Sequence, residues 1–586
     1  MRGKRFVAAA LTAATLAGLL GCAPVEEAVD SNLGTQIDPQ QIDNSQSIHL
    51  RDKDLLYSQY DNTEIVTMYL TVSSGSESEG TNHTWEEVNT YSAYDYDRWG
   101  VDRYKVAGLL QVGDENGLIP GELGFGQVAP NCTVQIRGQT SSKNAQKNYK
   151  ISIKDNKGSW RGQTTIALNK HQTEGLRFRN KMAFDLMAGM DEIMSLRTTF
   201  VRLYVKDTTA GKDAKFQDYG IYTQVEQLNK TALKAHGLDN RGHLYKINLC
   251  EFFPYEDVIM LKDDPRYDEK KFGEILEIKG DDDHTKLIAL LKDINDYTIP
   301  IDQILAEHFD VENITYWLAF NMLMGNMDTQ NRNFYIYSPQ NEERWYILPW
   351  DLDGMLRRTE YELADRIDYQ EWESGVSNYW GNVLFQRCLK SENFRKALDE
   401  AVTEMKYRLR PEVIDTYIET YSKLLKPLVY SGRDRLHAPL TPSEYDYVAK
   451  NINNEIADNY RRYQESLTKP MPFYIGVPQK TKSGYTVEWD GAYDFDGENI
   501  TYTFELDNTY TFDSPIVKQT GLEIPMATFD TLPAGQYFIR VTCQNESGQT
   551  QVAFDCYHVS KGKIYGTKCF YVDKKGNIVE DVYVEG

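Results

Sequence analysis

Four polar residues that could hold a divalent metal ion beside a phosphate crowd into one stretch, Gly325 to Gly354. Asp328 and Asn333 lie near its start, and Asp351 and Asp353 lie near its end. Carboxylate and amide oxygens are the hard ligands that Mg²⁺ takes, usually together with substrate phosphates. A carboxylate can also accept a proton from a hydroxyl group that attacks a phosphate. The stretch therefore predicts a metal-assisted phosphate site.

A β-hairpin is expected between the two polar clusters. Two short aromatic and β-branched runs, Phe334 to Tyr337 and Trp345 to Leu348, flank a turn that contains Pro and Asn, which is the pattern of a hairpin. Its open end would bring Asn333 and Asp351 together. The spacing Asp-x-x-x-x-Asn, a hairpin and then Asp-x-x-Gly is also the order of the catalytic loop and metal-binding Asp of protein kinases. A pattern this short often arises by chance, so it needs support from the rest of the chain.

An upstream turn could hold phosphates against this site. Arg137 begins a small, hydroxyl-rich turn that contains Ser141 and Ser142, and Lys147 enters the strand that follows. Backbone N–H groups and hydroxyls can donate to phosphate oxygens, and a Lys can neutralise their charge. Glu226, which ends a strand-like run, is a candidate partner for Lys147. The alternatives are an ordinary Gly/Ser hairpin and a solvated Glu at a strand end.

Size and charge narrow the class of protein. A chain of 586 residues exceeds one hydrophobic core, so two or three domains are expected. The net charge of −23 argues against nucleic acid as a partner, because phosphate contacts require basic patches. The seven cysteines show no Cys-x-x-Cys spacing, so a structural zinc site is not expected. Cys543 and Cys556 could form a disulfide, or these thiols could stay free.

The first 22 residues have the form of an export signal. Basic residues precede an apolar run from Phe6 to Leu20, and Gly21 and Cys22 follow, as in a signal sequence. Small and apolar residues before a Cys resemble a bacterial lipobox, so Cys22 is predicted to be lipidated after cleavage. An ordinary signal peptide with an incidental Cys is the alternative. The mature protein is then expected outside the cytoplasm, attached to a membrane through a lipid anchor only.

Strands dominate the next part of the chain and helices the part after it. A polar, flexible tether is expected over residues 23–48, followed by β-branched runs. Helical spacing predicts helices over Leu176 to Met190, Val311 to Met324, Asn393 to Val429 with a break near Pro411, and Ser443 to Leu467. Strands first and helices later predict a two-lobed α+β domain over residues 49–469.

The composition changes at Pro470. Short alternating runs and Trp489 predict a small all-β sandwich of the immunoglobulin or fibronectin III type over residues 470–560. The corner Leu532-x-x-Gly535-x-Tyr537 resembles that of a fibronectin type III domain. Residues 561–586 are interpreted as a tail without an assigned role.

Several motifs together resemble one family. They are Val134-Gln135-Ile136-Arg137-Gly138-x-x-Ser141-Ser142 with the Lys-x-Tyr strand after it, Arg179-Asn180-Lys181, Gly220-x-Tyr222-x-x-x-Glu226-Gln227, Leu244-Tyr245-Lys246, Asn326-x-Asp328-x-x-x-x-Asn333-Phe334-x-x-Tyr337 and Pro349-Trp350-Asp351-Leu352-Asp353. In this order they look like the CotH family, named for spore coat protein H, over roughly residues 50 to 465.

Members of that family are atypical protein kinases with a divergent kinase-like fold. The resemblance therefore implies phosphorylation of Ser or Thr with ATP and Mg²⁺, or Mn²⁺ in its place. It implies that Asp328 is the catalytic Asp and that Asp351 binds metal. Asn333 falls where a kinase loop places its second metal ligand, and Asp353 is either a further ligand or a turn residue. Nucleotide contacts are inferred, from position and chemistry, for Arg137, Ser141, Ser142, Lys147 and Glu226.

The predicted export sits badly with a kinase, because an exported lipoprotein meets little ATP. Three hypotheses therefore stay open. The first is an extracytoplasmic kinase that acts on a surface or secreted protein. The second is a non-catalytic surface-binding or adhesion protein on a kinase-like scaffold. The third is a carbohydrate-active accessory whose Tyr369 and Trp372 stack on sugars, with packing as the alternative. Retention of Asp328, Asn333, Asp351 and Lys147 together favours the first over the second, because a binding scaffold needs no buried acids around a metal.

Overall fold

The computed structural model describes residues 50, 52–53, 55–366 and 372–581. By their contacts, the described residues up to 366 and residues 373–465 form one unit, and Trp372 with residues 466–581 forms a second. The predicted signal peptide, Cys22 and the tether to residue 48 lie outside the described residues, as does Tyr369. No helix in the described ranges is both long and apolar enough to cross a membrane.

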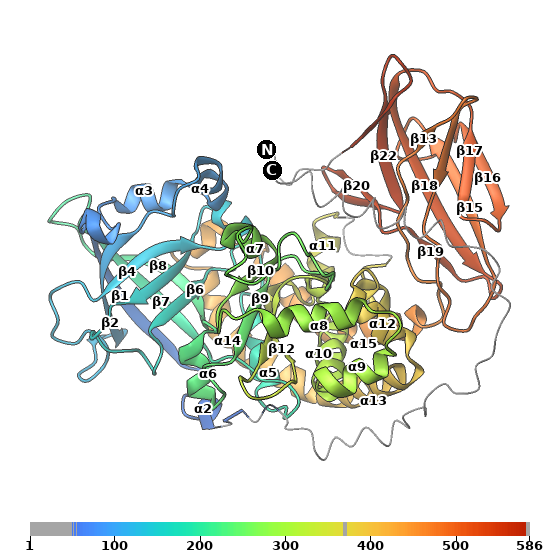
Figure 1. Ribbon diagram of the computed structural model, residues 1–586. Coiled ribbons are helices and arrows are strands. Elements are labelled where there is room, and N and C mark those ends of the chain that lie inside the picture. Colours follow the sequence, from blue (N-terminus) through green and yellow to red (C-terminus); the bar gives the residue numbers. More distant parts are fainter. Residues whose placement is uncertain (1–49, 51, 54, 367–371, 582–586) are drawn as a thin grey trace. The chain divides into compact units, whose positions relative to one another are not determined.

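The first part of the larger unit is a β-sheet that closes on itself (Figure 1). Its strands are β1 Ile65–Ser73, β2 Val106–Asp114, β3 Gly117–Leu118, β4 Cys132–Arg137, β5 Asn148–Ile153, β6 Thr165–Asn169, β7 Thr198–Asp207 and β8 Gln217–Glu226, in the order β1-β7-β8-β6-β5-β4-β2-β3. An additional pairing of β1 with β2 turns all of them except β3 into a barrel. Only β1 and β7 run parallel among the described pairs of this sheet.

Alternation of side chains gives the barrel an apolar inside and a polar outside. Along β4, Val134 and Ile136 are buried, and Gln135 and Arg137, which alternate with them, are half-buried, as expected for a period of two. The inward residues join one hydrophobic cluster with Trp85 and side chains of the other strands. Successive residues of one strand therefore alternate between the core of the barrel and its outer surface.

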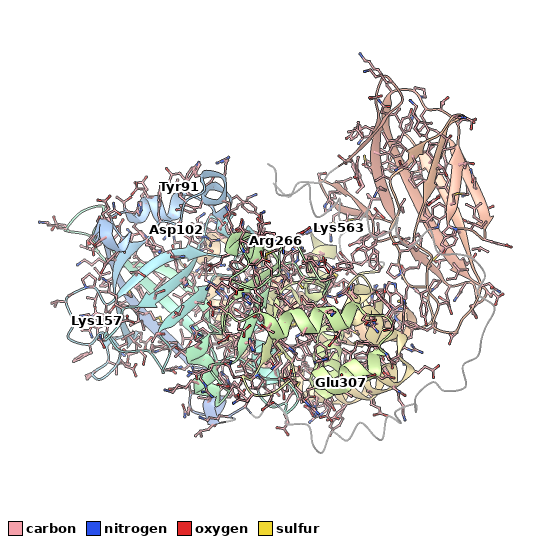
Figure 2. All side chains as sticks on the ribbon, viewed as in Figure 1. Tyr91, Asp102, Lys157, Arg266, Glu307 and Lys563 are labelled. Atoms are coloured by element: carbon pink, nitrogen blue, oxygen red, sulfur yellow. The ribbon has the colours of Figure 1, made fainter. Side chains whose placement is uncertain are left out.

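Two short helices, α3 Trp85–Thr90 and α4 Ala93–Trp99, bring aromatic side chains to the barrel. Thr84 and Glu87 form a capping box that fixes the start of α3. Tyr91, between the two helices (Figure 2), makes edge-to-face contacts with Tyr96 and Trp99. These contacts hold the two helices to the barrel through aromatic packing.

The remaining part of the larger unit is a small antiparallel sheet with helices around it. The sheet has the order β10-β9-β11-β12, from β9 His243–Ile247, β10 Leu276–Ile278, β11 Phe334–Ser338 and β12 Tyr346–Pro349. The helices are α2 Leu55–Ser58, α5 Arg179–Met187, α6 Lys230–His236, α7 Glu269–Ile275, α8 Thr285–Asn295, α9 Ile301–His308, α10 Val311–Leu323, α11 Arg358–Leu363, α12 Val383–Lys390, α13 Glu392–Arg408, α14 Pro411–Val429 and α15 Pro442–Ser466.

The predicted hairpin and helices are confirmed. Strands β11 and β12 pair antiparallel, with Phe334 opposite Pro349. The predicted break at Pro411 falls between α13 and α14, because Pro411 occupies the first turn of α14, where its missing N–H costs nothing. Helix α10 is buried on nearly all sides and begins at Asp310, whose side chain accepts from the backbone N–H of Asn313. The α+β class is therefore confirmed, whereas closure of the first sheet into a barrel was not predicted.

The second unit is an all-β sandwich. One sheet has the order β13-β14-β17, and the other has the order β16-β15-β18-β22-β23, with β19 beside β18. Their bounds are β13 Gln479–Lys480, β14 Tyr485–Glu488, β15 Ile500–Asp507, β16 Val517–Leu522, β17 Met526–Phe529, β18 Gly535–Asn545, β19 Thr550–Val552, β22 Thr567–Val572 and β23 Ile578–Glu580, and a separate hairpin joins β20 Cys556–Val559 to β21 Gly562–Tyr565.

Two details of this unit bear on the sequence predictions. The hydroxyl of Tyr537 donates to the carbonyl of Pro533 at 3.0 Å, which is the bond of a tyrosine corner. The segment after residue 560, predicted to be a tail, supplies β22 and β23 to the larger sheet. Cys543 and Cys556 are both free thiols. Trp372 is buried against Phe554, with ring centroids 5.1 Å apart, so it packs and presents no ring to a sugar.

Candidate active site

Asp328 stands at the end of the loop that follows α10. It lies in a single 3-10 turn, η5 Met327–Thr329, and two thirds of its side chain, 66%, is exposed. The Nδ2 of Asn333 donates to its Oδ2 at 2.8 Å, and the Nε of Arg332 lies 3.9 Å from Oδ1. The carboxylate is therefore held in one orientation and remains open to a substrate from solvent.

A buried polar network fixes the backbone of this loop. The side chain of Asn326 donates to Asn321 on α10, and the hydroxyl of Thr329 donates to the carbonyl of Asn326. From outside the loop, Asn378 donates to the carbonyl of Met327 at 3.3 Å. Because each of these groups is buried, losing a partner would leave an unsatisfied polar atom. The network therefore preorganises Asp328.

Asp351 follows the second strand of the hairpin, directly after β12 and Trp350, at the same open end as Asn333. Its backbone is left-handed, with φ of 56°, a conformation that a non-glycine residue rarely adopts and that concentrates at functional sites. Its side chain is exposed, and among the described residues no cation lies within ion-pair distance and no donor bonds to its carboxylate. Asp328 and Asp351 were both expected to be buried acids; instead, both reach solvent.

Electrostatics make Asp351 a site for a cation. Partial desolvation by the surrounding protein, together with the negative charge of Asp353, raises the pKa of Asp351 to about 6. Nearby positive charges on Arg137 and Lys246 act in the opposite direction. A carboxylate that is repelled by a second carboxylate and lacks a direct partner gains most from a metal ion.

Asp353 is engaged by a buried histidine. It lies in the 3-10 turn η6 Leu352–Gly354, and its Oδ2 is 2.9 Å from the Nδ1 of His171. Desolvation opposes ionisation of Asp353, but the bond to His171 and the charge of Arg357 prevail and lower the pKa of this carboxyl. Asp353 therefore stays charged, and one of its oxygens already has a partner.

Two cations, Arg137 and Lys246, act electrostatically on Asp351, and a third, Lys150, lies near Arg137. Arg137 on β4, Lys150 on β5 and Lys246 on β9 all have lowered pKa values, in each case chiefly because burial disfavours the charged form. Arg137 and Lys246 each feel the charge of Asp351, and Lys150 feels those of Glu277 and Arg137. The guanidinium of Arg137 lies 5.7 Å from the ring centre of Trp350. Cations stripped of water in this way are well suited to bind phosphate groups.

The predicted turn and its lysine do not face this cluster. The hydroxyl of Ser142 accepts from the backbone of Ala93 and donates to Gln139, and that of Ser141 accepts from Asn148. The ammonium of Lys147 donates to the carbonyl of Ser142 at 2.6 Å. These contacts tie the turn to itself and to α4.

The predicted pair of Lys147 and Glu226 does not form. Glu226 instead bonds to Arg197 at 2.5 Å and to the Nε2 of His236 at 2.9 Å. It is paired with Ile166 across β6 and β8 and shares the inner face of the barrel with that residue. Because Glu226 is already paired with Arg197 and His236, it does not position a phosphate-binding lysine.

Sequence reasoning assigned no role to Lys150, Lys246 or Glu277, although Lys246 stands in one of the family motifs. A signal for Lys150 existed: Arg137 pairs with Asn148 in the hairpin of β4 and β5, so the outward positions on β5 are Asn148 and Lys150. Lys246 pairs with both Glu277 and Tyr335, which no local pattern could reveal because the partners are far apart in sequence.

The donor set fits a hard divalent cation. Asp351 and Asn333 supply a carboxylate and an amide oxygen at the open end of the hairpin, as Mg²⁺ prefers, and Asp351 carries the unpaired charge. Among the described residues, no group of three or more His, Cys, Asp or Glu side chains could hold a metal ion alone. A metal ion held by Asp351 and Asn333 would take its remaining ligands from phosphates and water.

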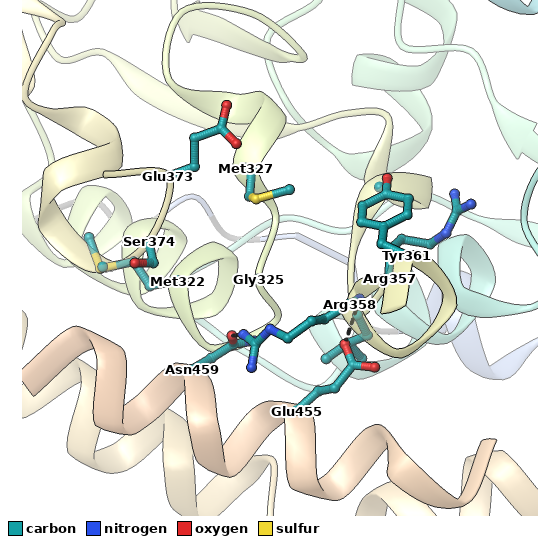
Figure 3. A pocket seen from close by; sticks show the side chains of 13 residues that line it. Met322, Gly325, Met327, Arg357, Arg358, Tyr361, Glu373, Ser374, Glu455 and Asn459 are labelled. Atoms are coloured by element: carbon teal, nitrogen blue, oxygen red, sulfur yellow. Dashed lines mark hydrogen bonds between the residues drawn. The ribbon is translucent and has the colours of Figure 1, made fainter. Parts of the chain in front are cut away.

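A small cavity of about 40 Å³ lies beside both loops (Figure 3). Gly325 and Met327 line it from the Asp328 loop, and Gly354 lines it from the Asp351 turn. Arg358 crosses its floor and donates to the side chain of Asn459 on α15. The cavity shows that the two acidic loops border common space on the side of the helices.

Comparison with known proteins identifies the family. A family model described as CotH kinase protein matches residues 134–463, which span both the Arg137 hairpin and the two acidic loops. The chain belongs to the CotH family. The chain is 23% identical over 286 residues, or 48% of its length and 72% of its relative, to inner spore coat protein H of Bacillus subtilis strain 168.

Two solved structures also align with this CotH protein, at low similarity. The proinflammatory kinase CtkA of Helicobacter pylori is 11% identical with a TM-score of 0.26, over 54% of this chain and 94% of that one. The toxin–antitoxin HipA–HipB–DNA complex of Shewanella oneidensis MR-1 is 10% identical with a TM-score of 0.24, over 51% of this chain and 58% of the other.

Proposed function

We propose that this CotH protein is an atypical protein kinase that transfers the γ-phosphate of ATP to Ser or Thr of a surface or secreted protein. The observation that carries the proposal is the position of Asp351. It is an unpaired carboxylate near the cations Arg137 and Lys246, with Lys150 beside Arg137, and it lies at the open end of a hairpin into which the Asp328 loop leads. Membership of the CotH kinase family supports the same chemistry.

Each side chain has a definite task in this mechanism. Asp351 and Asn333 would hold Mg²⁺ or Mn²⁺, which when bound neutralises charge on the phosphates. Arg137, Lys150 and Lys246 would bind phosphate oxygens through charged hydrogen bonds. These interactions matter most because phosphoryl transfer depends on positioning and charge more than on covalent chemistry.

Asp328 would act on the acceptor. Its carboxylate is exposed and is oriented by Asn333, so a substrate hydroxyl can approach from solvent and donate its proton to it. The hydroxyl oxygen would then form the new bond to phosphorus as the bond from phosphorus to ADP breaks. His171 would keep Asp353 ionised and turned away from the acceptor.

The proposed location of the protein outside the cytoplasm rests on its N-terminal sequence. Lipidation of Cys22 would hold the protein outside the cytoplasm by an anchor alone, with a protein substrate at the same surface. The name of the Bacillus subtilis relative, a spore coat protein, is consistent with action outside the cytoplasm. The fibronectin III-like sandwich would serve as a spacer or contact module.

Labelled ATP with the purified chain lacking its first 22 residues tests the proposal. Asp351→Ala should abolish binding of Mg²⁺-ATP and therefore transfer. Asp328→Ala should leave nucleotide binding within about twofold and reduce transfer by at least about a hundredfold. Glu307→Ala, which removes a surface carboxylate on α9 (Figure 2), is the matched control and should match the parent protein. Undiminished transfer in either site variant would refute the roles given above.

A thermal-shift measurement separates this proposal from a non-catalytic adhesion scaffold. A nucleotide that binds the folded state must raise its unfolding temperature. ATP with Mg²⁺ or Mn²⁺ should therefore stabilise the parent protein and not the Asp351→Ala variant. Absence of any shift would favour the adhesion protein.

A further inference from the structure

A second cavity, of about 250 Å³, opens at one end of the barrel. Lys147 precedes β5, Tyr219 lies near the start of β8 and Asp207 ends β7. Strand β7 is antiparallel to β8, and β5 and β8 are each antiparallel to β6, so these positions share one edge of the sheet. Ligands of closed sheets bind at such mouths. The space would hold about eight waters and so suits one small molecule.

This barrel-mouth pocket is distinct from the candidate active site. Tyr149 lines the pocket and belongs to the core inside the barrel. Its neighbour Lys150 lies on the opposite face of β5, with Arg137 and Glu277. None of the residues that line the pocket is an acid or cation assigned to the Asp351 cluster.

Two residues of this pocket have donor capacity that the described protein does not use. Lys147 is only 8% exposed, and its ammonium makes a single hydrogen bond within the described protein, to the carbonyl of Ser142, although it carries three N–H donors. Tyr222 is 2% exposed, and its hydroxyl bonds to no described residue. Lys147 has further N–H groups and Tyr222 a hydroxyl with which to donate, so the pocket suits a ligand that supplies acceptor oxygens.

A positively charged residue, Arg433, lies at the rim of the pocket, directly before the 3-10 turn η8 Asp434–His437. The guanidinium of Arg433, just before this turn, lies 4.4 Å from the ring centre of Tyr219 and has no carboxylate within ion-pair distance among the described residues. Of the two acids that line the pocket, Asp207 is occupied by Thr209, whose backbone N–H and hydroxyl donate to it, and Glu86 is exposed. The bonds from Thr209 leave the charge of Asp207 in place, so the case for an anionic ligand rests on the donors of Lys147, Tyr222 and Arg433 and not on the net charge of the pocket.

The walls are aromatic. Trp85 stacks on Tyr149 with ring centroids 5.0 Å apart, and the indole N–H of Trp85 donates to the hydroxyl of Tyr219. We propose that the barrel-mouth pocket binds a small carboxylate carried on a ring, with the carboxylate against Lys147 and Tyr222 and the ring against Trp85 and Tyr219. This site is independent of the kinase reaction, since it shares none of its assigned residues.

Calorimetric titration of the full mature chain with matched probes tests the chemistry. Benzoate and benzamide have the same ring and nearly the same size but differ in charge, and D-glucuronate and D-glucose differ in the same way on a sugar ring. Benzoate, D-glucuronate or both should bind, and the neutral partner of each binder should bind at least about tenfold more weakly. Whichever carboxylate binds more tightly identifies the ring as aromatic or sugar.

Three variants and one control locate the binding. Lys147→Met should weaken the carboxylate by about tenfold to a hundredfold, and Tyr222→Phe by about fivefold, because each removes one hydrogen bond to a charged group. Arg433→Gln changes an exposed residue at the rim, so it can be measured even if the substitutions at buried positions unfold the protein. It should weaken binding of the carboxylate by about threefold or more. Lys143→Met removes the same charge from an exposed lysine outside the pocket and should change nothing.

The proposal is overturned if neither carboxylate binds, if benzamide and benzoate bind equally, or if folded Lys147→Met retains the parent affinity. Asp351→Ala provides an internal separation of the two sites. It should bind the carboxylate as the parent does even when ATP binding is lost, so failure of the kinase proposal and failure of this one give different results.

Discussion

At the residue scale, Lys150 and Lys147 are three positions apart, but only Lys150 is expected to contribute to nucleotide binding. Lys150 lies outside the barrel with Arg137 and Glu277, whereas Lys147 lines the barrel mouth. Lys150→Met should therefore weaken Mg²⁺-ATP by about tenfold or more, because it removes a charged hydrogen bond to phosphate. Lys147→Met should leave it within about twofold. Fluorescence titration with a nucleotide analogue measures both, and the reverse order would restore Lys147 as the phosphate ligand.

The sequence indicated several candidate site residues by type, but it did not indicate which residues contact one another. The acids Asp328 and Asp351, the hairpin between them and the family follow from a local pattern. The choice between Lys147 and Lys150 depends on where β5 begins, because one residue of register changes the face of a side chain. The partners of Glu226 come from Arg197 and from α6, and no spacing along the chain indicates them. Burial of a charge is likewise set by tertiary packing alone.

At the element scale, Gly325 links α10 to the loop that carries Asp328. It has φ of 61°, and a Cβ there would lie 2.7 Å from the Nδ2 of Asn459 on α15, which donates to the carbonyl of Leu323. Gly325→Ala should therefore destabilise the larger unit by about 1–3 kcal/mol, through backbone strain and a displaced hydrogen bond. Gly189→Ala meets nothing within 4 Å and is the control. Urea unfolding compares them, and equal stability of both variants would contradict the linkage.

A buried histidine on α6 connects this helix to the N-terminal segment and to β8. His236 at the end of α6 lies 2.6 Å from Asp52 through Nδ1 and 2.9 Å from Glu226 through Nε2, so both ring nitrogens donate and the ring is charged. Although burial disfavours the charged form, these bonds raise the pKa of His236 to about 9, and bonds from His236 and Arg197 lower that of Glu226 to about 2. The N-terminal segment thus depends on this charge for its attachment to β8.

The pH dependence of stability follows from the sign of each shift. The contribution of His236 is complete below its unfolded pKa of about 6.5 and is lost as pH rises through 9. That of Glu226 is complete above about 4.5 and is lost as pH falls through 2. Parent protein should therefore lose roughly 2 kcal/mol between pH 6.5 and 9.5 relative to His236→Gln. Urea unfolding of both proteins at each pH measures this difference, and parallel curves would show that the ring is not charged in the fold.

Closure of the barrel could not be predicted from local pattern. The strands themselves carry alternation that marks them as strands. Strand β1, however, pairs with β7 more than a hundred residues later in the chain as well as with β2. Such pairings depend on the whole set of strands, so sequence indicates the strands but not their order around the ring. The barrel-mouth pocket follows from that order and had no local signal.

At the scale of the whole molecule, the two units have separate hydrophobic cores. The sandwich core contains Leu506, which is completely buried, and it includes no residue of the barrel. Domains with their own cores unfold as separate cooperative units. Scanning calorimetry should therefore show two transitions, and saturating Mg²⁺-ATP should shift only one of them, by about 2.7 kcal/mol at a hundred times the dissociation constant.

Leu506→Ala assigns the transitions. It should destabilise the sandwich by about 3 kcal/mol and lower its midpoint by roughly 10 °C, while the transition that responds to nucleotide stays in place. Asp351→Ala should do the reverse: both midpoints remain in the absence of ligand, and the response to Mg²⁺-ATP disappears. A single transition that moves as a whole with either change would mean that the units unfold together, and nucleotide binding to one would then stabilise the other through linkage.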